Sequence, residues 1–184
     1  SSDLKRSAKD INGYIINTFA GGGSKSNITD GMSATEARFN KINDIAVSAT
    51  GTIYLSTSVD IYKIAPNGEI FKVAGRGTPG YNGDGIPAIT AYLNGVTHLS
   101  VTSDDSIYFV DHGNYRIRRI DPNGIISTIA GTGENGYSGD GGPAIDAKIG
   151  IVYGMDIGPD GSVYIADMGN RRIRRIGPDG IITT

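Results

Sequence analysis

Short runs of alternating hydrophobic and polar residues fill most of the chain, separated by turns rich in glycine, proline and aspartate. In residues 172–176 the arginines interrupt isoleucines, which is the alternation of a strand and not the spacing of a helical face. Runs of this length between turn residues predict β-strands, and such short connections predict an antiparallel meander. The predicted strands of the last segment are Tyr153 to Ile157, Ser162 to Ala166, Arg172 to Ile176 and Ile181 to Thr184.

The same four-strand pattern occurs three times. The turn at residues 66–68 (PNG) returns at 122–124 and 178–180, a spacing of 56 residues each time. Repeats of about 40 to 50 residues that each hold four strands are typical of propeller blades. The first copy is two residues shorter, and the deletion falls in the turn between its second and third strands. We therefore predict an all-β fold, a β-propeller of four-stranded antiparallel blades, about three of which lie in this chain.

The repeat also predicts where the blades begin and end. Blades are expected at residues 40–73, 94–129 and 150–184, preceded by an outermost strand at 14–19 and an N-terminal extension at 1–13. The other strands of the first, partial blade are absent. We therefore expect two unsealed blade faces, covered by further blades of a longer parent or by other copies of the chain, in a ring or a fibre.

The linkers between blades are long. The second has the sequence GTGENGYSGDGGPAIDAKIG, and a loop of this length in a compact domain is often functional. We expect a helical turn after Pro143, because proline fits the first position of a helix. Positive φ angles are expected at the glycines around Asp140, and also at Gly113 and Gly169, which follow aspartates in tight turns.

Several phrases resemble the NHL repeat family of β-propellers. The resemblance rests on residues 161–176, on residues 106–120 and on the linker phrases GYNGDGIPA and GYSGDGGPA, and it covers about residues 14–184. The first copy departs from the pattern, since it lacks the Asp-x-Gly-Asn turn and the double arginine, and the usual proline before each innermost strand is missing. The resemblance implies a rigid disc that mainly binds other macromolecules, with a few enzymatic relatives.

Composition narrows the classes of function. Of the 184 residues, 38% are hydrophobic, enough for a globular core. The net charge of −2 gives no global reason to bind nucleic acid or an anionic membrane. No apolar run reaches about 18 residues, so we expect no membrane span. The absence of cysteine excludes disulfides and thiolate chemistry and fits the cytosol and the cell exterior alike; of the two, we favour an extracellular location.

Two histidines and four aspartates are candidates for metal chemistry. The amidating-lyase relatives have a histidine-bound zinc, but His98 and His112 occupy unlike repeat positions and are too few for a three-histidine site. We expect no metal and no other cofactor. The repeated GDG aspartates, Asp84 and Asp140, offer too few clustered oxygens for calcium, and we interpret them as caps of the following turn. Asp111 and Asp167 are interpreted as turn-forming residues.

Seven arginines in the second and third copies raise the alternative of RNA binding, which some NHL propellers perform. They occupy repeat-equivalent strand positions, so we favour pairing with acidic residues of adjacent blades and consider nucleic acid an unlikely partner. The first copy has Asp60, Tyr62 and Lys63 instead. The arginines are Arg116, Arg118, Arg119, Arg171, Arg172, Arg174 and Arg175.

Strand direction predicts a binding face. In a meander, the linkers lie at the same end as the turns between the second and third strands, and exposed loops on a rigid scaffold often bind ligands. We therefore predict a non-catalytic module that binds a protein or glycan through this face; a lactonase or lyase relative is the alternative. Asn27 begins a glycosylation sequon in a linker. The candidate binding residues are Lys41, Ser58, Tyr81, His112, Tyr137, Tyr153 and Met168.

Overall fold

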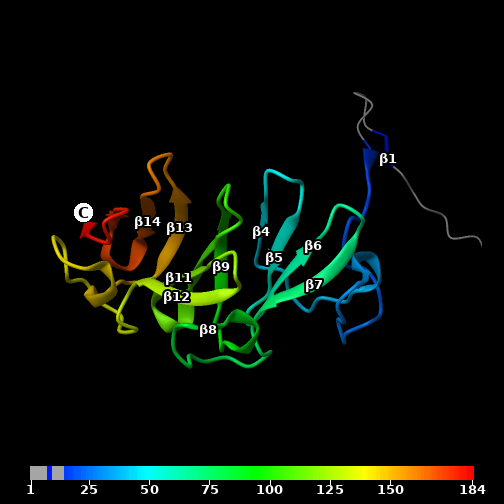
Figure 1. Cartoon of the computed structure of the whole chain (residues 1–184), viewed down its shortest axis with the longest axis horizontal. Coiled ribbons are helices and arrows are strands. Elements are labelled where there is room, and N and C mark those ends of the chain that lie inside the picture. The colour runs from blue at the N-terminus through cyan, green and yellow to red at the C-terminus, as the bar shows by residue number, and fades with distance from the viewer. Residues whose placement is uncertain (1–7, 10–14) are drawn as a thin grey trace, which may run out of the picture.

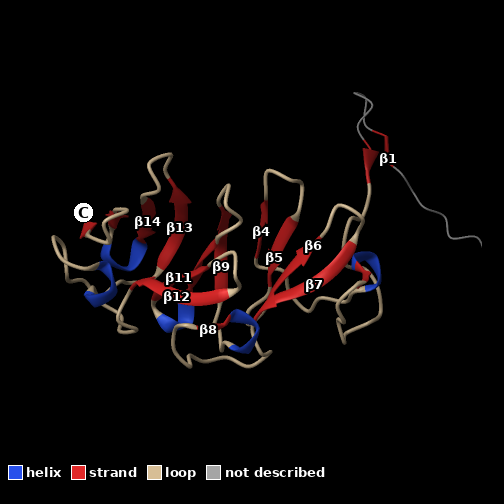
Figure 2. Cartoon of the chain, in the orientation of Figure 1, coloured by secondary structure: helices blue, strands red, loops and turns tan. Residues whose placement is uncertain are grey.

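The computed structural model describes residues 8–9 and 15–184. Three antiparallel sheets stand side by side (Figure 1), and helical structure is limited to single turns in the linkers and between strands (Figure 2). The predicted fold class is confirmed: the chain is all-β and consists of blades of a β-propeller. None of the helices in the described ranges has the length and hydrophobicity needed to cross a bilayer.

Each blade is a meander whose strands pair in sequence order. The first two blades carry a fifth, two-residue strand from the preceding linker at their outer edge, in the sheet orders β3-β7-β6-β5-β4 and β8-β12-β11-β10-β9. The first blade comprises β3 (Met32–Ser33), β4 (Asp44–Val47), β5 (Ile53–Ser56), β6 (Ile61–Ile64) and β7 (Glu69–Ala74). The second comprises β8 (Ile86–Pro87), β9 (Val96–Val101), β10 (Ile107–Asp111), β11 (Arg116–Ile120) and β12 (Ile125–Ala130).

The third blade has the order β13-β14-β15-β16, and a single bridge from Pro143 to Ile181 takes the place of the linker strand. Its strands are β13 (Val152–Ile157), β14 (Val163–Asp167), β15 (Arg172–Ile176) and β16 (Ile182–Thr183). The sequence did not predict the linker strands, because two residues are too few to show alternation. Five 3₁₀ turns complete the fold: η1 (Ala34–Glu36), η2 (Ala88–Thr90), η3 (His112–Asn114), η4 (Ala144–Asp146) and η5 (Met168–Asn170). The turn expected after Pro143 is η4.

The hydrophobic core lies between consecutive blades. Ile61 of the first blade and Phe109 of the second are both fully buried in one cluster, which Leu93 of the linker completes. Ile117 and Ile165 do the same between the second and third blades. The innermost strands β4 and β13 both contact β9, so the three inner strands lie next to one another (Figure 1).

The prediction of positive φ angles at Gly113 and Gly169 is wrong. Neither glycine has a positive φ. The left-handed residues of these turns are instead Tyr115 (φ 48°) and Arg171 (φ 57°), which end η3 and η5. Glycine is required for close approach at residue 169 instead, because a Cβ there would lie 2.8 Å from the Ile151 backbone nitrogen. The glycines on either side of Asp140 do have positive φ, 88° at residue 139 and 83° at residue 141.

The N-terminal predictions fall largely outside the described residues. Residues 1–7 and 10–14 are not described, and what is described of the extension is β1 (Ala8–Lys9), which pairs antiparallel with β2 (Ile15–Ile16). The assignment of residues 14–19 to an outermost blade strand, and of 1–13 to an extension, therefore stays a prediction.

Candidate functional site

The ends of the linkers meet the turns between second and third strands. The Gly95 N–H donates to the Ser58 carbonyl at 2.7 Å, and the His112 N–H donates to the Gly95 carbonyl at 3.3 Å. These bonds hold the first and second blades together at one end and shape an open depression of about 360 Å³ there. We call it the axial surface. Its lining residues are Lys41, Ile42, Asn43, Ser58, Gly95, Thr97 and His112.

An aromatic pair extends the axial surface toward the third blade. The rings of His112 and Tyr153 stack with centroids 6.3 Å apart and planes at 27°, and Tyr153 stays 64% exposed. Offset stacking of this kind leaves the outer ring face free for a ligand. Met168 begins η5 as His112 begins η3, and it is 43% exposed. The structure thus brings Lys41, Ser58, His112 and Tyr153 together.

Polar atoms with unused hydrogen-bonding capacity lie beneath this surface. Asn43 Oδ1 and Thr97 Oγ1 are buried, and neither has a hydrogen-bond partner among the described residues, whereas the Asn43 Nδ2 donates to the Val96 carbonyl at 2.9 Å. Buried polar atoms are nearly always paired, so such acceptors mark a place where a ligand or water completes the bonding. No sequence pattern had pointed to either residue.

His98 sits in a strained part of the same blade. It has a φ of 52° where the β9–β10 register shifts, and such bulges redirect side chains. Burial lowers the pKa of His98, an effect that the nearby Asp44 carboxylate opposes. The Asp44 carboxylate itself accepts the Leu99 N–H at 2.6 Å. In the described ranges, no three histidine, cysteine, aspartate or glutamate side chains gather as a metal site would require.

Two predicted binding residues, Tyr81 and Tyr137, lie apart from the axial surface. Each hydroxyl donates to the aspartate three residues later, at 3.1 Å for Tyr81 and 2.7 Å for Tyr137. Their rings carry the guanidinium groups of Arg116 and Arg172 at 3.9 Å and 4.0 Å from the centroids. These contacts attach each linker to its own blade.

The arginines pair within their own blade, so the expectation of pairing across blades is wrong. Arg118 is fully buried and meets Asp111 at 3.2 Å and Asp84 at 3.0 Å. Arg174 makes the same contacts with Asp167 at 3.8 Å and Asp140 at 2.7 Å. The partners lie on the adjacent strand and in the preceding linker, because the side chain points into the space under that linker and not toward the next blade.

The GDG aspartates therefore do not cap the following turn, as predicted, but bind these arginines; Thr128 and Thr184 also donate to them. Asp111 and Asp167 do form their turns, since each accepts the side-chain amide of the asparagine three residues later. Each also accepts a linker N–H, at 2.8 Å and 3.0 Å, which fixes the entry to the blade.

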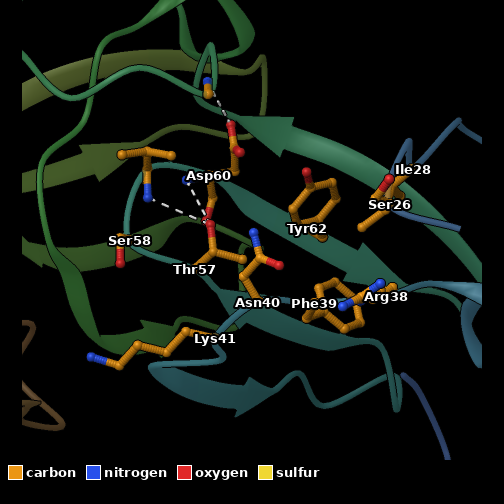
Figure 3. A pocket seen from close by; sticks show the side chains of 12 residues that line it. Ser26, Ile28, Arg38, Phe39, Asn40, Lys41, Thr57, Ser58, Asp60 and Tyr62 are labelled. Carbon is orange, nitrogen blue, oxygen red and sulfur yellow. Dashed lines mark hydrogen bonds between the residues drawn. The ribbon is translucent and has the colours of Figure 1, made fainter. Parts of the chain in front are cut away.

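A second cavity lies within the first blade, beside the axial surface (Figure 3). It has a volume of about 330 Å³ and opens where Lys41 points away from the blade. Sequence reasoning missed it, although the replacement of arginines by Asp60 and Tyr62 was the available signal. The lining residues are Ser26, Ile28, Arg38, Phe39, Asn40, Lys41, Thr57, Ser58, Val59, Asp60, Tyr62 and Gly77.

Asn27 is exposed in the linker before the first blade. Exposure is what a glycosylation acceptor requires, and the modification itself stays a prediction.

Comparison with known proteins supports the fold. Teneurin-1 of Mus musculus is 30% identical over 166 residues, which cover 79% of this chain and 6% of teneurin-1. The chain thus spans only a small part of the curated relatives it matches. Among solved structures, virginiamycin B lyase from Staphylococcus aureus is 26% identical with a TM-score of 0.52, over 78% of this chain and 41% of the lyase.

An auxiliary nutrient binding protein from Bacteroides ovatus is 20% identical with a TM-score of 0.60, over 77% of this chain and 38% of that protein, and this likeness bears on the fold alone. No protein-family model matches the sequence. The NHL repeat therefore stays a resemblance, and the fold that these likenesses support is the β-propeller.

Proposed function

We propose that this chain belongs to an NHL-type propeller that acts as a non-catalytic interaction module and binds a protein partner through the axial surface. The proposal rests mainly on the composition of this surface, where exposed Lys41 and Tyr153 lie together with His112. Beneath them, the buried acceptors of Asn43 and Thr97 have no partner among the described residues. Aromatic side chains in the centre of a patch supply most of the binding free energy in protein interfaces. The opposite end of the blades carries only short turns in the described part of the chain.

The likeness to mouse teneurin-1 supports a scaffold, while the likeness to virginiamycin B lyase keeps an enzyme as the alternative. Binding and catalysis make different demands on the axial surface. A binding surface needs Tyr153 and Lys41, whereas a lyase needs a proton-transfer group, for which His98 and His112 are the available imidazoles.

The test is a binding screen of the purified chain against an array of protein ectodomains, followed by affinity measurement on each hit. Tyr153→Ser and Lys41→Glu are each expected to weaken the affinity at least about tenfold, the loss typical of a central contact. Asn67→Ser and Asp179→Ser, on the opposite turns, are the matched controls and leave it unchanged. Loss of binding in the controls alone, or no hit on the array, contradicts the proposal.

The enzyme alternative has its own outcome. Stoichiometric zinc retained through dialysis, or turnover of a lactone or a cyclic depsipeptide that His112→Ala abolishes, replaces the binding module by an enzyme. Tight binding of single-stranded RNA that falls steeply with salt supports the RNA alternative instead.

A specific observation favours blade-to-blade association as a second function. Ile61 and Ile117 are fully buried by the following blade, but their equivalent Ile173 is 71% exposed. On the face of the first blade that points away from the second blade, Ile45 is 59% exposed. Leu99, at the matching place in the second blade, is only 8% exposed. The two open faces are therefore the two halves of the interface that joins the blades, and one fits the other in a front-to-back contact.

Light scattering against concentration tests this second function. The chain is expected to associate at micromolar concentration, and Ile173→Asp to shift it toward the monomer. Ile145→Asp is the matched control, because Ile145 is 50% exposed but lies in the linker turn η4, away from the open face. If the unmutated chain is a monomer, or if both variants associate equally, the proposal of blade-to-blade association is wrong.

A further inference from the structure

The cavity in the first blade occupies a space that the other blades fill with their own side chains. In the second blade the guanidinium of Arg118 lies there, with its carbon 4.9 Å from the centroid of the Tyr81 ring and a nitrogen 3.2 Å from Asp111. In the third blade the corresponding distance from Arg174 to Tyr137 is 5.0 Å. Arginine, tyrosine and aspartate together close the space under the linker.

All three filling residues are replaced in the first blade. Strand pairing and the repeat align Tyr62 with Arg118, Thr57 with Asp111 and Asn27 with Tyr81. The Tyr62 ring instead packs edge-to-face on Phe39 of the linker, with centroids 6.1 Å apart. No side chain replaces the guanidinium, and the cavity of about 330 Å³ is the result.

The cavity walls combine three kinds of chemistry. Ile28, Phe39 and Tyr62 form an apolar and aromatic side (Figure 3), and the neutral polar side chains Ser26, Asn40 and Ser58 line it too. Asn40 points into the space between the turn and the Tyr62 ring (Figure 3). None of these three polar side chains makes a hydrogen bond to another described residue, so their donors and acceptors are free for a ligand.

The charges of the cavity favour an anion. Arg38 and Lys41 line it, and neither forms an ion pair with any residue of the described part of the chain. The carboxylate of Asp60 is already used, since it meets the Lys72 ammonium at 2.7 Å and accepts the Gly77 N–H at 3.0 Å. Two cations without carboxylate partners therefore stand at a pocket whose one lining carboxylate, Asp60, is already paired with Lys72.

The geometry points to this cavity as a binding site for a carboxylate-bearing sugar, such as a uronic acid at the end of a glycan. Arginine binds carboxylates through charge-assisted hydrogen bonds, neutral amides and hydroxyls match sugar hydroxyls, and the electron-rich faces of aromatic rings attract polarised C–H groups. The volume lies at the lower end of the range for ligand pockets, about 300–1,000 Å³, which suits one or two sugar rings.

This site is separate from the axial surface, with which it shares only Lys41 and Ser58. Every lining residue belongs to the first blade or to the linkers on either side of it.

Calorimetry with methyl β-glucuronide and its neutral counterpart methyl β-glucoside tests the proposal on the whole chain. The glucuronide is expected to bind at least about tenfold more tightly, because the glucoside lacks the charged hydrogen bonds. Arg38→Gln should remove most of this preference. Arg171→Gln is the matched control, since Arg171 is an exposed arginine of the third blade, and it should leave the preference unchanged.

A filled-cavity variant separates loss of the site from loss of the fold. Asn27→Tyr, Thr57→Asp and Tyr62→Arg together rebuild the side chains of the second blade, so the variant should keep the parent's circular dichroism and lose glucuronide binding. Glucuronide binding that survives in this variant and in Arg38→Gln overturns the proposal, as does no binding at millimolar ligand. Tighter binding of an acidic peptide than of the glucuronide also overturns it, in favour of a protein partner.

Discussion

Replacing Arg118 by leucine tests the contacts that hold each linker to its blade. Arg118 and Asp111 are both fully buried, and their ion pair is 3.2 Å long. The variant leaves the Asp111 carboxylate buried with two hydrogen bonds, from the Asn94 N–H at 2.8 Å and the Asn114 side-chain amide at 2.8 Å. Removing one partner of a buried pair typically costs about 3–5 kcal/mol.

The protonation of Asp111 sets a ceiling on this cost. A carboxyl with an unfolded pKa of about 3.9 can be protonated at pH 7 for about 4 kcal/mol, and at pH 5 for about 1.5 kcal/mol. Burial already raises the pKa of Asp111, and the Asn114 amide, the Asn94 N–H and Arg118 oppose this rise, so removal of Arg118 raises it further. A carboxyl whose pKa is raised in the folded state stabilises the fold when it is protonated, and this stabilisation is lost as pH rises. We therefore expect a loss of about 3–4 kcal/mol at pH 7 and about 1–2 kcal/mol at pH 5.

Urea denaturation followed by circular dichroism measures both values. The matched control is Arg119→Leu, the next residue of the same strand, whose pair with Asp104 is 3.7 Å long and lies nearer the surface, with side chains 34% and 57% exposed. Exposed pairs contribute about 0–1 kcal/mol. Asp111→Asn added to Arg118→Leu should recover part of the loss by removing the buried charge. Equal losses in Arg118→Leu and Arg119→Leu, or a loss that does not shrink at pH 5, refute the reasoning.

Three further expectations follow from the contacts described above. Gly169→Ala should lower the unfolding free energy by about 1–3 kcal/mol in a denaturant titration, because its Cβ would lie 2.8 Å from a linker backbone nitrogen, and an unchanged midpoint argues against that close approach. Hydrogen bonds from Thr102 and Ser106 lower the pKa of Asp104 to about 2, so these bonds stabilise the fold above about pH 4 and lose this effect as pH falls toward 2. Asp104→Asn should therefore flatten the acid side of a curve of unfolding free energy against pH. Burial raises the pKa of Tyr62 to about 12, so the parent loses stability as pH rises from about 10 to 12, and Tyr62→Phe should remove one late-titrating tyrosine from an alkaline absorbance titration.

Strands and blades were predictable because they depend on short-range pattern. The alternation in residues 172–176 and the turn that follows directly at residues 177–180 are enough to define a strand, and β15 has the predicted bounds. The repeat then fixed the sheet order, since short turns allow only neighbouring strands to pair. The linker strands β3 and β8 were not predicted, because each has only two residues and pairs with a strand far along the chain.

Contacts across the linkers were not predictable from local pattern. Gly169 was assigned a positive φ from its place in a turn, but its need for glycine comes from the Ile151 backbone nitrogen at the linker end, which would lie 2.8 Å from an added Cβ. We predicted that the arginines pair across blades, because a strand position shows on which face an arginine lies but not which loop covers that face. Both errors arise where a loop folds back on a sheet, a contact that composition and periodicity do not encode.

One long-range signal was present in the sequence. Arg118 follows Asp84 by 34 residues, and Arg174 follows Asp140 by the same interval, with a tyrosine three residues before each aspartate. Equal spacing in two copies is expected when the residues form one contact, because the same fold places them together both times.

In the first blade, Tyr62, Thr57 and Asn27 stand where the other copies have arginine, aspartate and tyrosine, and Asp30, at the place of the linker aspartate, accepts the Lys72 N–H at 2.8 Å instead. Loss of the arginine alone would leave the buried aspartate at the end of the second strand unpaired, whereas joint replacement of both leaves no buried unpaired charge. The outer strand of this blade is instead tied to the turn by the 2.7 Å pair of Lys72 and Asp60. Because that pair lies beside the emptied space and not within it, the blade keeps its shape with a cavity open under its linker. A ligand there needs no rearrangement of the scaffold, and that is why the shortest and least regular of the three copies is the one in which we expect a binding site.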